Sequence, residues 1–430
     1  MTCDDCGGPL TGAAKYCSGA CRQRAYRRRA RDGVQGSPRL DTFVGRQAEL
    51  AGLTRLLARH RIVTVTGPPG VGKSRLVQEA VAHRRHTMLI DVTRVTGLVS
   101  GAATPGLLVL DGCEHVLEDC AELVQRHPAL RVLATSREPL NVPGEQAYRL
   151  TPLEPHEAAR LFCDRALAVD SEFDESADLL DTVCERLDRL PLALELAARL
   201  VRVLTLEEIA ARLGNRFTVL TTGPRDAEAH HRSLHAAIDR SYQVLTETER
   251  AALRTFSLLP GGISEELADA VMPHGWEIAK SLNARSLLES GERLTMLESV
   301  RLFAFDALLQ HDSIAVRDRL LDVLATLPEP SRTEEADNIR YAARLMPGDD
   351  RLVTGNDEGD EAEEVTLGPL SWREERLLRV AAMVAEGLTN KQIADGLHVS
   401  LRTVEGDVRD LKTALGVRSR AQIAAWATRA

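Results

Sequence analysis

Three short apolar runs, each ending in a polar residue, mark the first half of the chain as α/β. They are residues 62–66 (IVTVT), 107–111 (LLVLD) and 130–135 (LRVLAT). Runs that are apolar throughout, rather than alternating, are typical of strands buried on both faces of a parallel sheet. The first run leads through a glycine-rich segment into residues 75–80, whose pattern predicts a helix. We therefore predict an α/β domain with a parallel sheet.

The last sixty residues change to a helical period. Residues 371–386 predict an amphipathic helix, and Thr389 with Gln392 has the spacing of a capping box that begins a second helix. After a turn at residues 398–400, residues 402–415 predict a third helix. Apolar residues recur along the last two helices at Ile393, Ala394, Leu397, Val399, Val404, Val408 and Leu411. This arrangement predicts an all-α helix-turn-helix.

Between these ends the pattern predicts mainly helices. Residues 250–259 and 267–271 predict two of them, and residues 294–298 predict a strand that enters a further helix. Residues 328–366 contain Pro, Gly and the acidic run 357–364, so we expect a disordered acidic linker there.

The amino-acid composition is that of an ordinary globular protein and does not by itself indicate a function. A length of 430 residues predicts about three domains, and 44% apolar with 27% charged residues is ordinary for globular protein. No apolar run approaches the ~20 residues that cross a bilayer, and the polar start is unlike a signal peptide, so we expect a cytoplasmic protein with no membrane partner. The net charge of -9 averages over domains and does not exclude a nucleic-acid partner.

The segment at residues 67–74 (GPPGVGKS) has the G-x-x-x-x-G-K-[ST] spacing of a phosphate-binding loop. Glycines let successive N–H groups turn toward phosphate oxygens, and the following helix adds partial positive charge at its N-terminus. Lys73 is expected to reach the β- and γ-phosphates and Ser74 to ligate Mg²⁺. The flanking strand and helix argue against a turn that binds nothing. The nucleotide-binding candidates are Gly67, Pro68, Pro69, Gly70, Val71, Gly72, Lys73, Ser74 and Arg75.

Two further polar groups follow the predicted strands. Asp111 ends the second run, where a Walker B aspartate holds Mg²⁺ directly or through water. The next residue is Gly112, so the carboxylate that often polarises the attacking water is missing there, and Glu114 is a candidate substitute. Arg137 follows the third run and is a candidate γ-phosphate sensor, the alternative being a surface arginine. The catalytic candidates of a slow ATPase are Lys73, Asp111 and Arg137.

The N-terminal segment predicts a small zinc finger. Its four cysteines form one C-x2-C pair and one C-x3-C pair, a pattern that in a cytosolic chain favours Zn²⁺ over disulfides. The expected ligands are Cys3, Cys6, Cys17 and Cys21. The alternative is a redox-active or unliganded tail. Six arginines in residues 22–31 either neutralise phosphates or form a solvated helix or linker.

Five segments in order resemble the STAND class of signal-transducing NTPases, relatives of the NB-ARC and AAA+ folds. They are residues 43–46 (FVGR), the phosphate loop, residues 108–115 (LVLDGCEH), 135–140 (TSREPL) and 190–198 (LPLALELAA). The resemblance implies that Val44, Gly45 and Arg46 lie near adenine, and that Pro191 packs on the base from a helical lid.

This sequence departs from the STAND pattern at two places. Gly112 stands where the family usually has Asn, and Arg189 stands where it usually has Gly, just before the lid helix. In NB-ARC proteins a Met-His-Asp sequence places a histidine on the β-phosphate, whereas this chain has Met296-Leu297-Glu298, as in the bacterial regulator branch, so that histidine cannot sense the nucleotide here. The expected order is a zinc finger with basic helix (1–32), a linker (33–40), a P-loop NTPase domain (41–165), a helical lid (166–230), a winged helix (231–327), the acidic linker (328–366) and the helix-turn-helix (367–430).

The C-terminal helices resemble the LuxR-type (GerE) DNA-binding domain, through residues 387–394 (GLTNKQIA), 403–405 (TVE) and 415–420 (LGVRSR). The resemblance implies a double-stranded DNA partner, and the candidate contacts are Lys391, Arg402, Thr403, Glu405, Arg409, Lys412, Arg418 and Arg420. Residues 370–430 carry ten Arg/Lys against seven Asp/Glu, a net charge of only +3. Glu405 and Asp407 replace common basic residues, and we expect Asp407 to face the DNA backbone, where its charge opposes binding.

These features predict an ATP-switched transcription regulator that binds ATP or ADP, Mg²⁺ and Zn²⁺, self-associates on activation, and answers a protein or small-molecule signal. A scaffold of the NLR kind, whose output is assembly, is the alternative that the acidic recognition helix leaves open. A P-loop enzyme that phosphorylates a small substrate would leave the helix-turn-helix unexplained.

Overall fold

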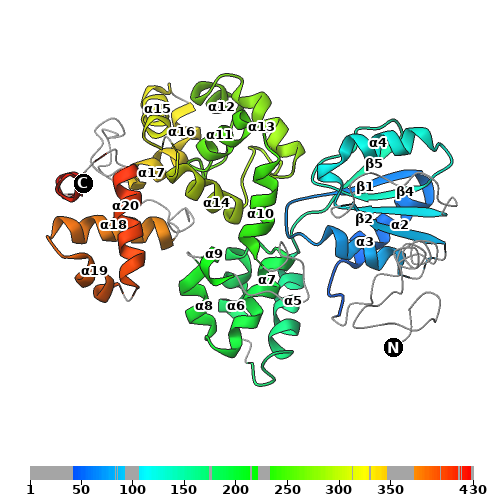
Figure 1. The fold of residues 1–430 in the computed structure, drawn as a ribbon, viewed down its shortest axis with the longest axis horizontal. Coiled ribbons are helices and arrows are strands. Elements are labelled where there is room, and N and C mark those ends of the chain that lie inside the picture. The colour runs from blue at the N-terminus through cyan, green and yellow to red at the C-terminus, as the bar shows by residue number, and fades with distance from the viewer. Residues whose placement is uncertain are drawn as a thin grey trace, which may run out of the picture. The chain divides into compact units, whose positions relative to one another are not determined.

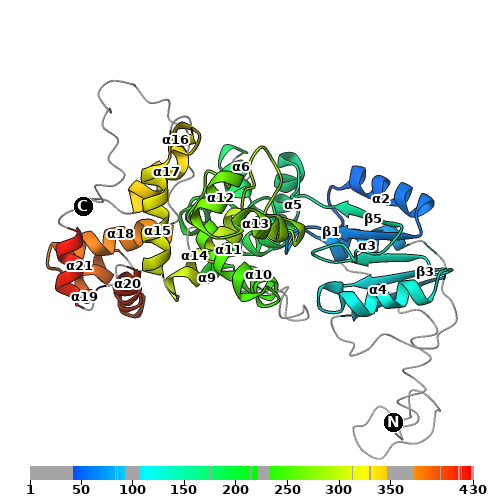
Figure 2. The same ribbon diagram turned by 90° about the horizontal axis from the view of Figure 1, so that it is seen from above.

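The computed structural model describes residues 42–82, 84, 86–92, 106–173, 177–213, 216–220, 233–311, 313–328, 331–345, 372–397, 399–414, 417 and 419–427. The chain divides between Leu153 and Glu154 into two compact units, drawn in Figures 1 and 2 and described here one at a time. The four candidate zinc ligands, the basic segment after them and the first linker lie outside the described residues. Within the described ranges, no helix is both long and apolar enough to span a membrane.

The first unit contains a parallel sheet, as predicted. Its described strands are β1 (Ile62–Thr66), β2 (Thr87–Asp91), β3 (Leu107–Asp111), β4 (Val132–Thr135) and β5 (Glu145–Arg149). Their order is β2-β3-β4-β1-β5, so β4 lies between the strand before the phosphate loop and the strand that ends at Asp111. The apolar pattern did not predict β2 or β5. Neither has a buried residue, because both are edge strands.

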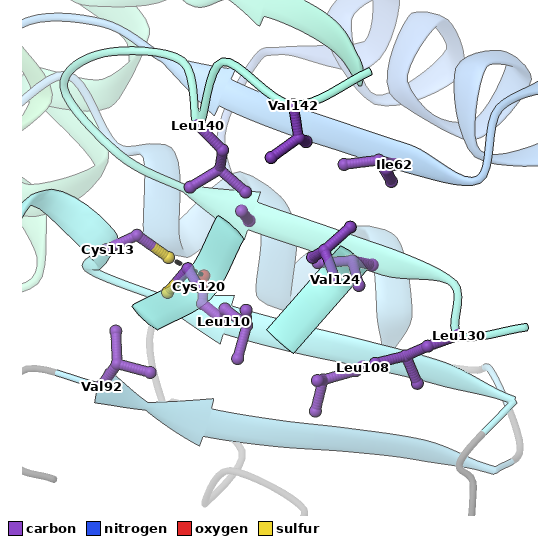
Figure 3. Close-up of a cluster of buried hydrophobic side chains, with 12 residues drawn as sticks. Ile62, Val92, Leu108, Leu110, Cys113, Cys120, Val124, Leu130, Leu140 and Val142 are labelled. Carbon is purple, nitrogen blue, oxygen red and sulfur yellow. Dashed lines mark hydrogen bonds between the residues drawn. The ribbon is translucent and has the colours of Figure 1, made fainter. Parts of the chain in front are cut away.

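Helices cover both faces of this sheet. The helical segments are α2 (Gln47–Arg59), α3 (Lys73–Val81), the short η2 (Cys113–His115) and α4 (Leu117–Arg126). In Figure 1, α4 lies on one face and α3 on the other. Figure 3 shows the core under α4, where Cys120 and Val124 pack on Leu108 and Leu110 of β3. Because side chains alternate along a strand, Val109 belongs to the opposite face.

The register brings the ends of four strands together. Asp91 of β2 is paired with Asp111 of β3, and Val65 of β1 is paired with Thr135 of β4. All strands run in one direction, so these carboxyl ends form a single edge of the sheet. The phosphate loop leaves β1 at this same edge, as is usual for ligand sites in open parallel sheets.

The second unit begins with the helices predicted to form the lid. They are α5 (Pro155–Leu167), α6 (Ala177–Arg186), α7 (Pro191–Ala198), η3 (Arg199–Arg202), α8 (Leu206–Arg212) and α9 (Arg216–Val219). Helix α5 packs on α6 and α7. It therefore groups with the lid in the second unit, although the sequence analysis placed nearly all of it with the NTPase domain.

The region expected to be a winged helix follows. Its elements are α10 (Leu234–Gln243), α11 (Glu247–Phe256), α12 (Glu265–Val271), α13 (Gly275–Ala284), α14 (Glu298–Leu309) and α15 (Ser313–Thr326). Two further helices, α16 (Ser331–Glu334) and α17 (Ala336–Leu345), lie in the range predicted to be a linker. The strand predicted at 294–298 is reduced to two isolated bridges, from Leu294 to Ile263 and from Thr295 to Glu289. The helix predicted to follow it begins at Glu298.

The prediction of a disordered linker from residue 328 is wrong for residues 331–345. Glu335 accepts hydrogen bonds from Arg293 Nη2 at 2.6 Å and from Ser264 Oγ at 2.9 Å. Asn338 is buried and holds the glycine turn before α12 through its side-chain amide, which accepts from Gly261 N at 2.8 Å. The polar composition misled the prediction because these polar side chains pair inside the fold rather than with water.

The helix-turn-helix is confirmed. Its helices are α18 (Trp372–Ala385), α19 (Asn390–Gly396), α20 (Leu401–Ala414) and α21 (Arg420–Ala427). The capping box at the start of α19 is present as predicted, since Thr389 Oγ1 accepts from Gln392 N at 3.3 Å while Gln392 Oε1 accepts from Thr389 N at 2.9 Å.

The turn before the lid helix α7 keeps the shape of a glycine turn without the glycine. Asp188 and Arg189 have φ values of 54° and 51°, in the left-handed region. Arg189 N donates to Cys184 O at 3.0 Å, which closes the C-terminus of α6. The family's usual glycine would adopt this conformation without steric cost, whereas a residue with a Cβ pays about 1–2 kcal/mol there. The departure at Arg189 therefore strains the turn but does not reshape it.

We expect Arg189→Gly to stabilise the second unit by about 1 kcal/mol, because it removes this strain. Chemical denaturation of the two proteins measures the difference. Arg199→Gly is the matched control, since Arg199 has an ordinary φ of −69° and glycine there should lower stability. Equal destabilisation by both substitutions would contradict the assignment of strain to Arg189.

Candidate nucleotide-binding site and helix-turn-helix

The phosphate loop has the backbone shape that its glycines predict. Gly67, Gly70 and Gly72 have φ values of 151°, 80° and 95°. A Cβ added to Gly67 would lie 2.4 Å from Leu150 O, so no side chain fits at that position. Gly72 caps α3, which begins at Lys73 and leaves its first N–H groups without helical acceptors. The loop and the helix end together can hold an anionic oxygen.

The Lys73 ammonium lies over this loop. Its Nζ donates to Gly67 O at 2.8 Å and to Pro68 O at 3.0 Å. Burial lowers the pKa of Lys73 to about 8, an effect that Arg137 reinforces and that the carboxylates of Glu114 and Asp111 partly offset. A phosphate group beside Nζ would favour the charged ammonium and so raise its pKa again. The buried lysine therefore favours an anionic ligand at this site.

We expect the affinity for MgATP to be level below pH 8 and to fall about tenfold per pH unit above it. The sign follows from Lys73: above the pKa of the free protein, binding must also draw in a proton to restore the ammonium that the phosphates need. Calorimetric titrations between pH 7 and pH 9.5 measure this slope. In Lys73→Arg, whose guanidinium stays protonated, the residual affinity should not change with pH. A level wild-type affinity up to pH 9.5 would contradict the expectation.

Ser74, Asp111 and Thr135 form the candidate Mg²⁺ site. Ser74 Oγ donates to Asp111 Oδ1 at 2.7 Å, and the Thr135 hydroxyl donates to the same carboxylate oxygen. Oxygens at adjacent corners of an octahedral Mg²⁺ shell lie roughly 2.9 Å apart, given metal–oxygen distances of about 2.05 Å. The Ser74 and Asp111 oxygens therefore fit Mg²⁺ with little movement. Mg²⁺ is usually held by one or two protein groups together with substrate phosphates and water, which is how Ser74 and Asp111 would hold it here.

Thr135 is a functional candidate that the sequence analysis missed. Its Oγ1 also accepts from Gly112 N at 2.9 Å, so it fixes the backbone directly after Asp111. The signal was a hydroxyl residue at the end of an apolar strand, but only the strand order places it beside β3.

Glu114 and Arg137 pair with each other at the same edge. Arg137 Nη2 lies 3.3 Å from Glu114 Oε1, and Arg137 is buried while Glu114 is half-buried. Arg137 is thus not a surface arginine, and its charge is close enough to lower the pKa of Lys73. Glu114, the candidate substitute for the missing carboxylate at Gly112, is held by this ion pair.

Arg46, in the segment just before α2, contacts the phosphate loop through Val71. Arg46 is buried with a φ of 66°, and its Nη2 donates to Thr151 O at 2.7 Å and to Val71 O at 3.3 Å. Gly45 is also buried and Val44 is half-buried. Their proximity to adenine stays a prediction. So does the contact of Pro191, which begins α7 in the second unit.

Asp188, in the strained turn before α7, caps a helix 110 residues further along the chain. Its carboxylate accepts from Glu298 N and Ser299 N, both at 2.8 Å, at the start of α14. Arg216 lies 3.4 Å from the same carboxylate, yet burial raises the pKa of Asp188 above its ordinary value. The turn next to the lid motif is therefore tied directly to the Met296-Leu297-Glu298 segment. Sequence spacing carried no signal of this contact.

The recognition helix α20 has one buried side and one exposed side. Val404, Asp407, Val408 and Leu411 are buried. Of the candidate DNA contacts, Arg402, Glu405 and Arg409 are exposed on α20, and Lys391 is exposed at the start of α19. Thr403 and Lys412 are half-buried. The exposed side thus carries both signs of charge.

The expectation that Asp407 faces the DNA backbone is wrong. Its two carboxylate oxygens accept from Arg376 Nε and Nη2 of α18, each at 2.7 Å. Only 7% of the Arg376 side chain and 3% of the Asp407 side chain are exposed. Both residues lie inside the domain because position 407 falls between Val404 and Val408 on the core side of α20. The charge at position 407 is neutralised there and does not oppose DNA.

Of the two remaining candidate DNA contacts, Arg420 makes hydrogen bonds inside the domain. The Arg420 guanidinium donates to Asn390 Oδ1 at 2.5 Å and to Leu388 O, so it ties α21 to the start of α19. Arg418 lies outside the described residues.

The fold and the two sites define a multidomain P-loop protein that ends in a helix-turn-helix. Residues 369–427 match the family model described as "Bacterial regulatory proteins, luxR family". Over 281 residues the chain is 36% identical to "Uncharacterized protein Rv0894" of Mycobacterium tuberculosis, covering 55% of this chain and 71% of the relative. The chain belongs to the family of Rv0894.

A second mycobacterial relative is longer. It is "Putative HTH-type transcriptional regulator Rv0890c" of Mycobacterium tuberculosis, 33% identical over 347 residues that cover 69% of this chain and 39% of that protein.

Two solved archaeal structures are similar at low identity. The Walker-type ATPase PABY2304 of Pyrococcus abyssi has a TM-score of 0.46 and 11% identity, and the match covers 61% of this chain and 95% of that one. The STAND protein PH0952 of Pyrococcus horikoshii, with a tetratricopeptide repeat sensor, has a TM-score of 0.30 and 18% identity. This match covers 91% of this chain and 62% of that one.

Proposed function

We propose that this protein is a transcription regulator whose DNA binding is switched by ATP. The observation that carries the proposal is the presence in one chain of a built phosphate site and a LuxR-type recognition helix. In the first, Ser74 Oγ lies 2.7 Å from Asp111 under the Lys73 loop. In the second, α20 exposes Arg402 and Arg409. ATP, ADP and Mg²⁺ are the nucleotides and metal that the first site would hold.

The switch would act through the second unit. We infer that ADP favours a closed state and that exchange for ATP, or a signal, releases the winged helix for self-association. The Asp188 cap on α14 supports this route, since its hydrogen bonds join the turn before the lid motif to the start of α14. Dimers would bind paired half-sites in promoter DNA, and assembly would raise affinity through effective concentration.

Hydrolysis should be slow, because Gly112 supplies no carboxylate beside Asp111 and Glu114 is held by Arg137. We expect turnover by the purified protein to stay below about 1 s⁻¹, at the low end of the ordinary enzyme range. Phosphate release under saturating MgATP measures it, with Asp111→Ala as the background control. Sustained turnover above that value would contradict the switch and favour a working ATPase.

Genomic footprinting in the source cell tests the function as a whole. Wild type should protect localised promoter sites, and Lys73→Ala should lose them while the protein is still present. A wild-type protein that protects no site, yet assembles with ATP in vitro, would favour the NLR-like scaffold instead. That alternative is weakened because one of the two acidic residues that motivated it, Asp407, is buried against Arg376.

The N-terminal zinc finger remains part of the proposal. One Zn²⁺ held by Cys3, Cys6, Cys17 and Cys21 would give the first 32 residues a fold of their own and present the basic segment that follows.

A further inference from the structure

Gly406 lies in the middle of α20 without a reason in the fold of the domain. Glycine is the least favourable residue inside a helix after proline, so its presence in a 14-residue recognition helix calls for a cause. A Cβ built at this position would meet only Arg409 Nη2, at 3.9 Å, which is ordinary van der Waals contact. Its φ is not in the left-handed region. Alanine would fit there.

Of the other described glycines of this domain, Gly387 has a backbone reason. It follows the end of α18 with a φ of 83°, a conformation that side chains rarely adopt. A Cβ on Gly396, at the exposed C-terminal end of α19, would lie 2.9 Å from Met383 Cε, the end of a flexible side chain that can move aside. Gly406 differs from both, because it lies in a helix interior with an ordinary φ and room for a Cβ.

The position of Gly406 on the helix points away from the core. Val404 and Val408, both buried, are each two residues from it. At 100° per residue, this places Gly406 roughly 160° round the helix from both. Glu405 and Arg409 are exposed and lie on one side of Gly406 around the helix, at about −100° and −60°. Gly406, itself half-buried, therefore lies on the face that would enter the major groove, beside a carboxylate and a guanidinium.

We propose that Gly406 determines specificity by leaving the backbone of α20 bare, so that the helix approaches the edge of a base pair more closely than any side chain would allow. The inference rests on the proposed function, since the partner is duplex DNA. Close approach brings Glu405 within reach of a cytosine N4 amino group and Arg409 within reach of guanine O6 and N7, the base groups these side chains recognise. The position without a side chain excludes no base by itself but sets the depth of the helix in the groove.

A randomised-duplex selection with the full chain, MgATP and fixed salt tests this inference. Wild type should select a preferred sequence. Gly406→Ala should bind that sequence at least about tenfold more weakly, the effect of one lost base contact, while its affinity for unrelated duplex is unchanged because phosphate contacts remain. The thermal midpoint of Gly406→Ala should not fall, which separates lost recognition from lost folding.

Gly396→Ala is the matched control, because the same chemical change at an exposed position of α19, near only the movable end of Met383, should keep the selected sequence. If Gly406→Ala binds the wild-type sequence with undiminished affinity, the inference is overturned while the proposed function stands. If wild type selects no sequence at all, both are overturned.

Discussion

Lys73→Ala should reduce ATP affinity by at least about 100-fold, beyond detection in an ordinary calorimetric titration. The substitution removes the ammonium that lies over Gly67 and Pro68, so that within the loop itself only backbone N–H groups remain to hold the phosphates. A charge-assisted bond to phosphate in a buried site is among the stronger single contacts in a protein.

The control for this prediction is Lys280→Ala, which removes an exposed lysine from α13 and should leave ATP affinity unchanged. Circular dichroism of both variants checks that the fold is kept. If Lys73→Ala binds ATP as tightly as wild type, residues 67–74 are not a phosphate-binding loop, and the proposed nucleotide switch is contradicted as well.

Asp407→Ala should destabilise the helix-turn-helix by about 3–5 kcal/mol, since it leaves the Arg376 guanidinium buried without its carboxylate. Asp407→His should act in the same direction. A sequence-based design would instead choose histidine there to improve DNA binding. The double variant Arg376→Met with Asp407→Leu should recover most of the lost stability, because buried ion pairs are often replaceable by apolar side chains of similar volume.

Tryptophan fluorescence can follow this domain within the full chain. Trp372 and Trp426 belong to the helix-turn-helix, and the remaining tryptophan of the chain is Trp276, so a Trp276→Phe background isolates the signal. Asp395→Ala, at an exposed position of α19, is the control and should change stability by less than about 0.5 kcal/mol. Equal unfolding curves for Asp407→Ala and Asp395→Ala would show that the buried pair contributes nothing.

Much of the nucleotide site was predictable because its chemistry is local. The phosphate loop depends on backbone conformations that only glycine adopts easily, so residues 67–74 carry their own structural signal. Asp111 was predictable for a related reason, as the polar end of a strand that is apolar throughout. Thr135 was not predictable, because its role depends on β4 lying beside β3. The residues of one strand do not determine which other strand it pairs with.

The sequence by itself determined the parallel sheet, the phosphate loop, the capping box and the helix-turn-helix, since each depends on a short-range pattern that a few neighbouring residues impose. Tertiary structure alone decided where the charges act. Asp407 and Arg376 pair across 31 residues, Asp188 caps α14 across 110, and Glu335 and Asn338 fold what looked like a linker. The physical reason is that a polar side chain looks the same in a sequence whether it meets water, DNA or a buried partner, and only packing in three dimensions supplies that partner.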